Sequence, residues 1–432
     1  MFINFDEMNM IKALFIWIGL CALSARAQQN ESILLDGLNH RITEVKSFDS
    51  TDTSEFGILG NQISGFKVIG LGEATHGTRE FYQYKAKLIK YLVEHQGLRV
   101  LVFESDMVGM ESINDYVLNK DGLTLEKAMS NYGLFGIYRT REVADLIQWI
   151  KRFNMKQPVQ DKVMIAGMDA NMPYHIASKI LQSKSLFPYL DDRLKKDLAE
   201  IRSMPERRNF GQARKKYLLD VADKLGSIVQ DKLNPDSLEI YSHYIQLLIQ
   251  SLRMINLDDI QLNTVRDAHM AENILWLLQK TTDKQTLAIW GHNGHICADK
   301  WRGYQSTGMH LRSKLKGRYY ALGLAVGEGY ARLWDSRNGI PFHKAPLPAI
   351  QNTGQFEFVL KQLKYPNFFL PIGSGIEDKT LRTYLSKPLL TRVLGAQVVR
   401  SEQDILLPIR VDRAYNGIVF FRETTNAAEI VF

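Results

Sequence analysis

The chain has 432 residues, of which 45% are hydrophobic and 23% are charged. This balance excludes an intrinsically disordered protein and provides enough apolar residues for a large core. The formal net charge is +7, but the basic residues of the 184–232 region are interleaved with acidic ones, which is typical of a solvated helical face. We therefore expect no nucleic-acid partner.

The first 27 residues have the pattern of a secretory signal peptide. The apolar run 13–23 follows Lys12 and precedes the Ala-Arg-Ala sequence of a cleavage site. We predict cleavage after Ala27, which leaves a mature protein of residues 28–432 that is periplasmic or secreted and has no stable membrane anchor. The alternative is an uncleaved anchor, although the run is shorter than the roughly 20 residues that span a bilayer.

Short apolar runs predict the strands of the main domain. In chain order they are 67–71, 99–103, 162–167, 286–290 and 319–326. Helical patterns separate them, and this alternation is typical of an α/β fold with a mostly parallel central sheet flanked by helices. Residues 174–281 have helical periodicity and no convincing strand, so we interpret them as a helical insertion between two strands.

Polar residues follow each of these runs. They are Glu73 and His76, Glu104 and Asp106, Asp169, His292 and His295, and Glu328. Any single acidic residue in such a position is equally well explained as a helix cap. Because a parallel sheet brings the carboxyl ends of its strands to one edge, the repeated pattern predicts a single site there.

Two cations lie on otherwise apolar helical faces. Lys85 falls on the stripe of the helix that follows the first run, and Arg266 shares a face with Met270 and Leu277. An inward-facing cation needs a partner or a water-filled cleft, so both are candidates to stabilise an oxyanion. The alternatives are snorkelling of the Lys85 stem and an ion pair of Arg266 with Asp267 or another helix.

Several common catalytic patterns are absent. There is no Gly-x-Ser-x-Gly elbow, P-loop or Gly-x-Gly-x-x-Gly sequence after a strand, which disfavours a serine α/β-hydrolase, an NTPase and a dinucleotide enzyme. His292 and His295, with nearby carboxylates, permit a zinc site, but the His-Glu-x-x-His pattern is missing. We expect neither a metal nor a cofactor, and we interpret Cys297 as a buried structural residue.

Five ordered motifs resemble the erythromycin esterase family. They are Gly72–Phe81, which begins Gly-Glu-Ala-Thr-His-Gly, then Phe103–Asp106, Ala166–Asp169, Arg266–Asn273 and Trp290–His295. The resemblance covers about residues 66 to 330, and we expect it to extend to the end of the chain. It implies an α/β core with helical additions, metal-independent hydrolysis of an ester or macrolactone, and His76 as the essential histidine. It also makes Glu73, Glu104 and His292 look like polar members of the site.

The resulting prediction is an exported esterase that acts on a small-molecule ester without a covalent intermediate. His76 would be the general base on a water molecule, and Glu73 would orient it. Glu104 and His292 would position the water or carry the proton to the leaving alkoxide. Arg266 and Lys85 would stabilise the oxyanion. Four residues are predicted to bind substrate: His295, Asp106, Asp169 and Asn293.

Two departures from this prediction are open. Relatives of known activity tend to carry arginine at the place of Lys85, and lysine cannot reproduce the bidentate fork of arginine. Distant relatives of the core with a Gly-x-x-His type of motif, the Tiki and TraB proteins, are known or suspected metalloproteases, so a metal-dependent hydrolase or peptidase is one alternative. A haem- or ligand-binding protein without catalytic activity, as in iron-uptake relatives, is the other.

Overall fold

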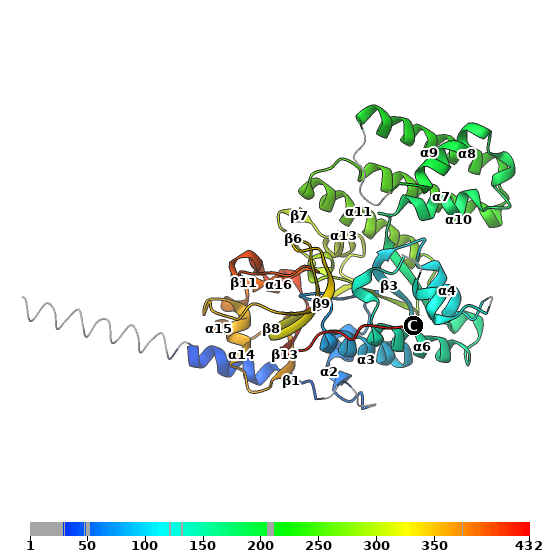
Figure 1. Cartoon of the computed structure of the whole chain (residues 1–432). Helices are drawn as coiled ribbons and strands as arrows, with labels where there is room; N and C mark the ends of the chain where they lie inside the picture. Colours follow the sequence, from blue (N-terminus) through cyan, green and yellow to red (C-terminus); the bar gives the residue numbers. More distant parts are fainter. Residues whose placement is uncertain are drawn as a thin grey trace, which may run out of the picture.

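Within the part of the chain that the computed structural model describes, the centre of the molecule is one nine-stranded sheet. The described residues are 29, 31–46, 48, 52–120, 122–130, 133–204, 211–373 and 375–432. The predicted signal peptide lies outside them. Helices flank the sheet, and a group of further helices, α7 to α11, stands beyond one end of it (Figure 1).

Six neighbouring strands of the sheet are parallel. In spatial order they are β13 (Gly417–Thr424), β8 (Tyr319–Asp335), β2 (Val68–Leu71), β5 (Thr286–Trp290), β3 (Leu98–Asp106) and β4 (Met164–Asp169). Three antiparallel strands complete the sheet: β10 (Asn367–Pro371), β1 (Thr43–Glu44) and β9 (Ile340–Pro346). The prediction of an α/β fold with a mostly parallel central sheet is confirmed.

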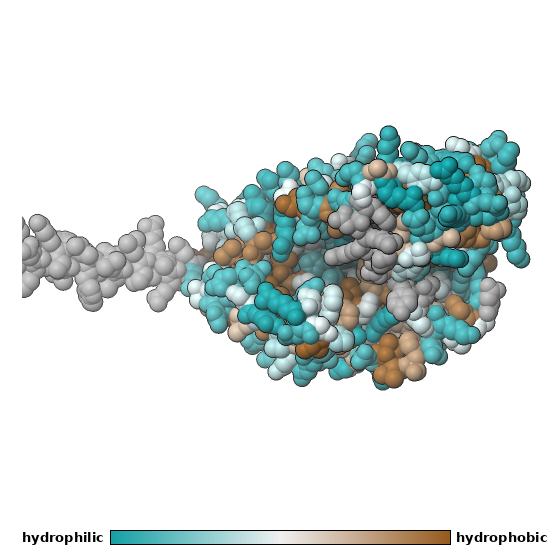
Figure 2. Space-filling model, turned by 45° about the horizontal axis from the view of Figure 1, so that its top comes forward, coloured by the Kyte–Doolittle hydropathy of each residue, from teal (hydrophilic) through white to brown (hydrophobic). Residues whose placement is uncertain are grey.

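Helices connect these strands and make up the region at the end of the sheet. The described helices are α2 (Phe56–Ile63), α3 (Arg79–His95), α4 (Glu111–Val117), α5 (Leu125–Ser130), α6 (Arg141–Asn154), α7 (Pro173–Leu181), α8 (Asp192–Arg202), α9 (Gln212–Lys232), α10 (Pro235–Arg253), α11 (Asp259–Leu278), α12 (Asn293–Ile296), α13 (Thr307–Lys314), α14 (Phe356–Lys361), α15 (Lys379–Leu385) and α16 (Val411–Ala414). None of them is long and apolar enough to cross a membrane. Figure 2 shows hydrophilic residues over most of the displayed face, with hydrophobic residues in small groups.

Two predicted strands are longer in the structure than their apolar runs: β3 extends to Asp106, and β8 extends furthest. β8 continues past residue 326 to Asp335, because residues from Tyr330 onward pair with β9. Glu328 therefore lies within the strand, and its Oε2 accepts a hydrogen bond from Lys361 Nζ at 2.9 Å. The prediction that Glu328 follows the strand and joins the site is wrong.

The central strands are buried on both faces, which is why they read as continuous apolar runs. In β5, Leu287 and Ile289 pack into one hydrophobic cluster, whereas Ala288 and Trp290 pack into a second cluster on the other face. Helices α3 and α6 close the cluster around Trp290, and α7 and α13 contribute to the other.

The position of β5 in the sheet brings together the polar residues that follow the strands. β2 and β3 are consecutive in the chain, yet β5 lies between them in the sheet. The chain leaves the sheet after β4, runs through α7 to α11 (Figure 1) and returns at β5. The carboxyl ends of β2, β5, β3 and β4 consequently lie side by side, as at the edge where open α/β sheets bind their ligands.

Candidate active site

The Gly-Glu-Ala-Thr-His-Gly turn after β2 depends on its two glycines. A Cβ atom on Gly72 would lie 2.1 Å from Asn293 Oδ1. Gly77 has a φ of +75°, and a Cβ atom there would lie 2.3 Å from the backbone oxygen of Arg332. Only glycine fits such positions without strain. The two glycines therefore fix the backbone that carries the acid and the imidazole.

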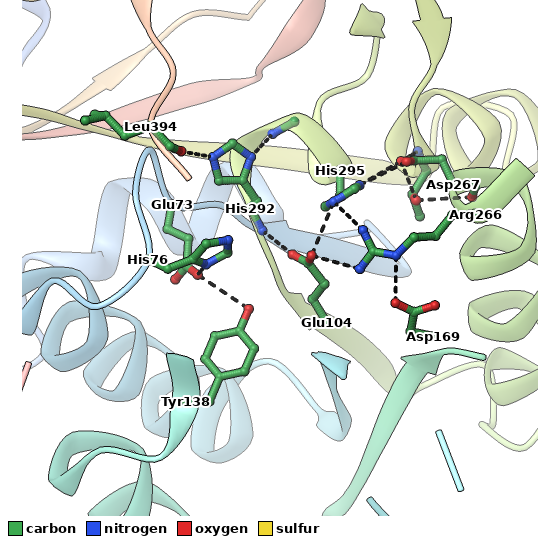
Figure 3. A network of polar contacts seen from close by, with 12 residues as sticks. Glu73, His76, Glu104, Tyr138, Asp169, Arg266, Asp267, His292, His295 and Leu394 are labelled. Carbon is green, nitrogen blue, oxygen red and sulfur yellow. Dashed lines mark hydrogen bonds and ion pairs between the residues drawn. The ribbon is translucent and has the colours of Figure 1, made fainter. Parts of the chain in front are cut away.

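Glu73 is fully buried and binds four side chains, of which His76 and Tyr138 are labelled in Figure 3. Its Oε1 lies 2.6 Å from His76 Nδ1 and 3.4 Å from the Tyr138 hydroxyl. Its Oε2 accepts hydrogen bonds from Lys85 Nζ and, at 3.2 Å, from Trp290 Nε1. Burial raises the pKa of Glu73, but Lys85 and the hydrogen bond from His76 outweigh it and hold the pKa below its ordinary value. Glu73 is thus a carboxylate that accepts the Nδ1 proton of His76.

In the neutral form of His76, this arrangement selects the tautomer whose other nitrogen, Nε2, carries no proton. A neutral imidazole carries one proton, and the carboxylate beside Nδ1 holds that proton there. The His76 side chain keeps 9% of its surface exposed. Nε2 therefore carries a lone pair that can accept a proton from a water molecule, which is the geometry that general base catalysis requires.

Lys85 faces inward, beneath Glu73. Its side chain is fully buried, and Nζ lies 4.2 Å from the centre of the Trp290 ring. Burial lowers the pKa of Lys85 to about 8, although Glu73 opposes this effect. The ammonium is the counterion of Glu73 and does not snorkel to the surface.

Arg266 joins two carboxylates from neighbouring strands. Its Nη2 lies 3.1 Å from Glu104 Oε1, and its Nε lies 2.7 Å from Asp169 Oδ2 (Figure 3). The ion pairs are thus made with the sheet and not with Asp267. Burial raises the pKa of Glu104, but His295 and Arg266 outweigh it and hold the pKa well below its ordinary value. Arg266 keeps 16% of its side chain exposed.

His295 lies between two acids. Its Nδ1 is 3.0 Å from Asp267 Oδ1, and its Nε2 is 3.2 Å from Glu104 Oε1. Burial lowers the pKa of His295, but these two carboxylates outweigh it and raise the pKa to about 10. His295 is therefore an imidazolium at neutral pH. Together with Arg266 it offsets the charge of Glu104.

Both ring nitrogens of His292 are bonded to the backbone. Nδ1 accepts a hydrogen bond from the Gly294 N–H at 3.1 Å, and Nε2 donates to the Leu394 carbonyl. Burial and the nearby His76 lower the pKa of His292 to about 4, so the ring is neutral. The rings of His292 and His76 are 5.3 Å apart. In this conformation His292 has no free nitrogen for the proton transfer that the sequence suggested.

Two of the predicted substrate-binding residues also have partners within the protein. The Asn293 amide donates to the Leu324 carbonyl at 2.8 Å and accepts from the Leu324 N–H at 3.1 Å, so it is used to hold β8. Asp106 Oδ1 lies 2.7 Å from His175 Nδ1 and accepts a hydrogen bond from the Gly109 N–H. Asp106 Oδ2 is buried and has no partner among the described residues.

The structure brings Arg266, Asp169, His295 and the backbone of His292 into one polar network around Glu104, and His76 and Lys85 into a second around Glu73. The side chains of Asp106 and Asn293 bind other partners and belong to neither network. Sequence reasoning missed Tyr138, Trp290 and Asp267 as contributors. Trp290 and Asp267 lie within the recognised motifs and could have been found there. Tyr138 comes from the short helical turn Gly136–Tyr138, where no regular pattern points to it.

A metal site was the main alternative use of these histidines. Among the described residues, no group of three or more His, Cys, Asp or Glu side chains is arranged to hold a metal ion. The nitrogens of His292 are bonded to the backbone, and those of His295 lie beside Asp267 and Glu104. The donor geometry therefore does not favour the zinc hypothesis.

Comparisons with known proteins identify the family and agree with the fold. The erythromycin esterase family model matches residues 93–424, a range that begins beyond the turn that holds His76. The putative hydrolase YbfO of Bacillus subtilis (strain 168) is 24% identical over 383 residues, which cover 80% of this chain and 83% of YbfO. Erythromycin esterase type II of Escherichia coli is 22% identical over 419 residues, covering 88% of this chain and 94% of that protein.

A solved structure of a mutant erythromycin esterase, EreC, in its open conformation superposes on this chain with a TM-score of 0.66. The identity is 16%, and the match covers 91% of this chain and 99% of that one. A likeness at this level of identity concerns the fold. The assignment of individual side chains therefore rests on the geometry above.

Proposed function

The chain belongs to the erythromycin esterase family, and from this premise we propose that it hydrolyses a carboxylic ester with a water molecule activated by His76. The observation that carries the proposal is the 2.6 Å contact between His76 Nδ1 and Glu73 Oε1. It holds the imidazole in the tautomer whose Nε2 can take a proton. The same logic orients the base in the Ser-His-Asp triad.

In the first step, His76 Nε2 takes a proton from water as the water oxygen bonds to the ester carbonyl carbon. The carbonyl oxygen becomes an oxyanion, and His76 becomes an imidazolium whose charge Glu73 offsets. In the second step, the tetrahedral intermediate collapses, the bond to the leaving oxygen breaks, and His76 returns the proton to the leaving alkoxide. The products are a carboxylic acid and an alcohol, with no enzyme-bound acyl group.

Arg266 is our candidate for stabilising the oxyanion. It is partly exposed, whereas Lys85 is enclosed under Glu73. A preorganised donor of this kind contributes about 3–4 kcal/mol to transition-state stabilisation in enzymes where it has been removed. Lys85 is instead a positioning residue, because it reaches the reaction only through the carboxylate of Glu73.

Glu104 and His292 also act by positioning in this proposal. Glu104 Oε2 accepts the backbone N–H of His292 at 2.9 Å, while its Oε1 holds Arg266. His292 in turn binds the Leu394 carbonyl and so fixes the segment that lies against the His76 turn. The low pKa of Glu104 and the backbone bonds of His292 do not suit either residue to donate a proton to the alkoxide.

Relatives named erythromycin esterases make macrolides one class of ester to test, with antibiotic resistance as the associated role. The decisive experiment is a hydrolysis screen of macrolides and simple nitrophenyl esters, with wild type beside His76→Ala. Reactions run in oxygen-labelled water should place the label in the acid product. Activity should survive chelation of metals. Loss of activity with chelator, or equal activity of His76→Ala, would reject the proposal.

A further inference from the structure

Another imidazole–carboxylate pair, separate from those of His76 and His295, lies at the same edge of the sheet. Asp106, at the end of β3, is 1% exposed, and His175, in the first turn of α7, lies 2.7 Å from it. The His175 side chain is 13% exposed, close to the 9% of His76. The mechanism proposed above uses neither Asp106 nor His175.

The surroundings of this pair contain polar atoms without partners. Asp106 Oδ2, Asn171 Oδ1 and His269 Nδ1 are buried, and none has a hydrogen-bond partner among the described residues. A buried polar atom left unpaired is costly, so such atoms in native proteins bind water or a ligand. Three of them in one region indicate that a group from outside the chain completes it.

Contacts place these three residues around the end of β4. Asp106 is the sheet partner of Asp169, and Asn171 follows Asp169 by two residues. On α11, Arg266 binds Asp169, and Asn273, two turns later, donates to the Met168 carbonyl. His269 lies between these two contacts on the same helix. We call Asp106, Asn171, His175 and His269 the β4-end cluster.

The cluster is continuous with the proposed catalytic site. Arg266 joins Asp169 to Glu104, and Asp169 and Arg266 lie on the far side of Glu104 from His76 (Figure 3). From β2 there are two strand intervals to β3, which carries Asp106, and three to β4, each of about 4.8 Å, so the cluster lies about 10–14 Å from the strand that precedes His76. A ligand that reaches both the cluster and His76 must be larger than a simple acetate ester.

The groups in the cluster match a hydroxyl. Asp106 Oδ2 and Asn171 Oδ1 accept hydrogen bonds, and the imidazoles of His175 and His269 can donate or accept. A hydroxyl both donates and accepts. An ammonium only donates, and it would lie near the guanidinium of Arg266. Burial lowers the pKa of His269, so this ring is neutral and keeps an accepting nitrogen.

We propose that the β4-end cluster binds a hydroxyl group carried by the ester substrate about 10–14 Å from its scissile bond. The substrate then carries at least one hydroxyl group remote from the ester bond that is cleaved. This inference rests on the proposed esterase function and adds a second point of recognition to it. Because binding at this distance is the same in the ground and transition states, it should lower KM and leave kcat unchanged.

The test uses nitrophenyl esters with a long arm on the acyl side and alkyl acetates with the same arm on the alcohol side. Each arm ends in a hydroxyl, a methyl ether or a primary amine. In one of the two series, the one whose arm reaches the cluster, we expect KM for the hydroxyl-armed ester to be roughly 3- to 10-fold below KM for the ether-armed ester. This factor corresponds to one or two neutral hydrogen bonds. The difference should disappear in His175→Phe and in Asn171→Leu. It should persist in the control His40→Phe, whose side chain is 79% exposed.

Three results would overturn the inference. Equal KM values for the hydroxyl and ether arms on both sides would mean that the cluster binds only water. Preference for the amine arm would mean a cation site. A hydroxyl preference that survives both His175→Phe and Asn171→Leu would place the subsite elsewhere.

The esterase proposal fails separately, if no ester is hydrolysed in a His76-dependent way. Calorimetric titration with the amide analogue of the hydroxyl-armed ester then still measures the affinity of the cluster for the hydroxyl arm, because the amide need not be cleaved. Tighter binding to wild type than to His175→Phe supports the inference, and equal binding rejects it.

Discussion

His76 Nδ1 lies 2.6 Å from Glu73 Oε1, inside a pocket of side chains in which Glu73 has no exposed surface. The two residues are three positions apart, and the turn between the glycines at 72 and 77 directs both side chains to one point. This contact determines which nitrogen of His76 is free. The first two predictions below, on catalysis by His76 and on the absence of an acyl-enzyme, follow from this contact.

Replacement of His76 by alanine should lower kcat by about 10²–10⁴-fold, the usual contribution of a general acid–base. The fold should be retained, because the His76 ring makes its main contact with Glu73 at the edge of the core. Steady-state kinetics and circular dichroism measure the two effects. Full activity in His76→Ala would require another base.

The absence of covalent catalysis is a separate expectation. Because water is the proposed nucleophile, rapid-quench kinetics should show no burst and mass spectrometry no acyl-enzyme. Cys297→Ser is the control: Cys297 is buried, and burial raises the pKa of its thiol to about 12, so this change should leave kcat within about twofold. An acyl adduct on any Ser, Thr or Cys would contradict the mechanism.

The Glu73–Lys85 pair gives a stability prediction. Lys85→Met leaves the buried Glu73 carboxylate without its counterion and should reduce the free energy of unfolding by about 3–5 kcal/mol. The double variant Glu73→Gln/Lys85→Met contains no charge at either position and should regain most of that stability. It should still have low activity, because glutamine does not offset the imidazolium of His76. Denaturant unfolding of the three proteins measures the coupling, and purely additive losses would disprove it.

The raised pKa of His295 leads to a prediction for how the stability of the folded protein depends on pH. Its pKa is about 10 in the folded protein and about 6.5 when unfolded. The folded state therefore binds the proton more tightly, and this stabilisation is complete below about pH 6.5 and is lost as the pH rises through about 10. Tm should fall more steeply over this range in wild type than in His295→Gln. The lowered pKa of Lys85, about 8, has the opposite effect and makes the folded state more stable as the pH rises. This effect is the same in wild type and in His295→Gln, so it does not change the difference between them. Parallel Tm curves would argue that His295 is neutral.

Export is tested on protein from the native host. If residues 1–27 are a signal peptide, N-terminal sequencing should find Gln28 as the first residue of mature protein in the periplasmic or extracellular fraction. Protein that keeps its original N-terminus in the cytoplasm would show that the leader is not used.

The sequence by itself was sufficient to predict five of the six parallel strands and the turn that carries Glu73 and His76. Continuous apolar runs mark strands buried on both faces, and the two glycines mark a backbone that other residues cannot adopt. These signals are local, so they can be read without knowing what packs against them. The same local reading placed Glu328 at a strand end and failed, because the extension of β8 depends on its pairing with β9.

Only the tertiary structure decided which polar groups touch. The insertion of β5 between β2 and β3 joins residues about two hundred positions apart, and no pattern along the chain records that order. Only the folded structure shows that Lys85 pairs with Glu73 and that Arg266 pairs with Glu104 and Asp169. It also shows that the ring nitrogens of His292 are bonded to the backbone. Sequence patterns identify residue types that can do chemistry, whereas protonation states depend on burial and on neighbours a few ångströms away. For that reason the sequence identified candidate residues, and the fold determined which of them contact one another.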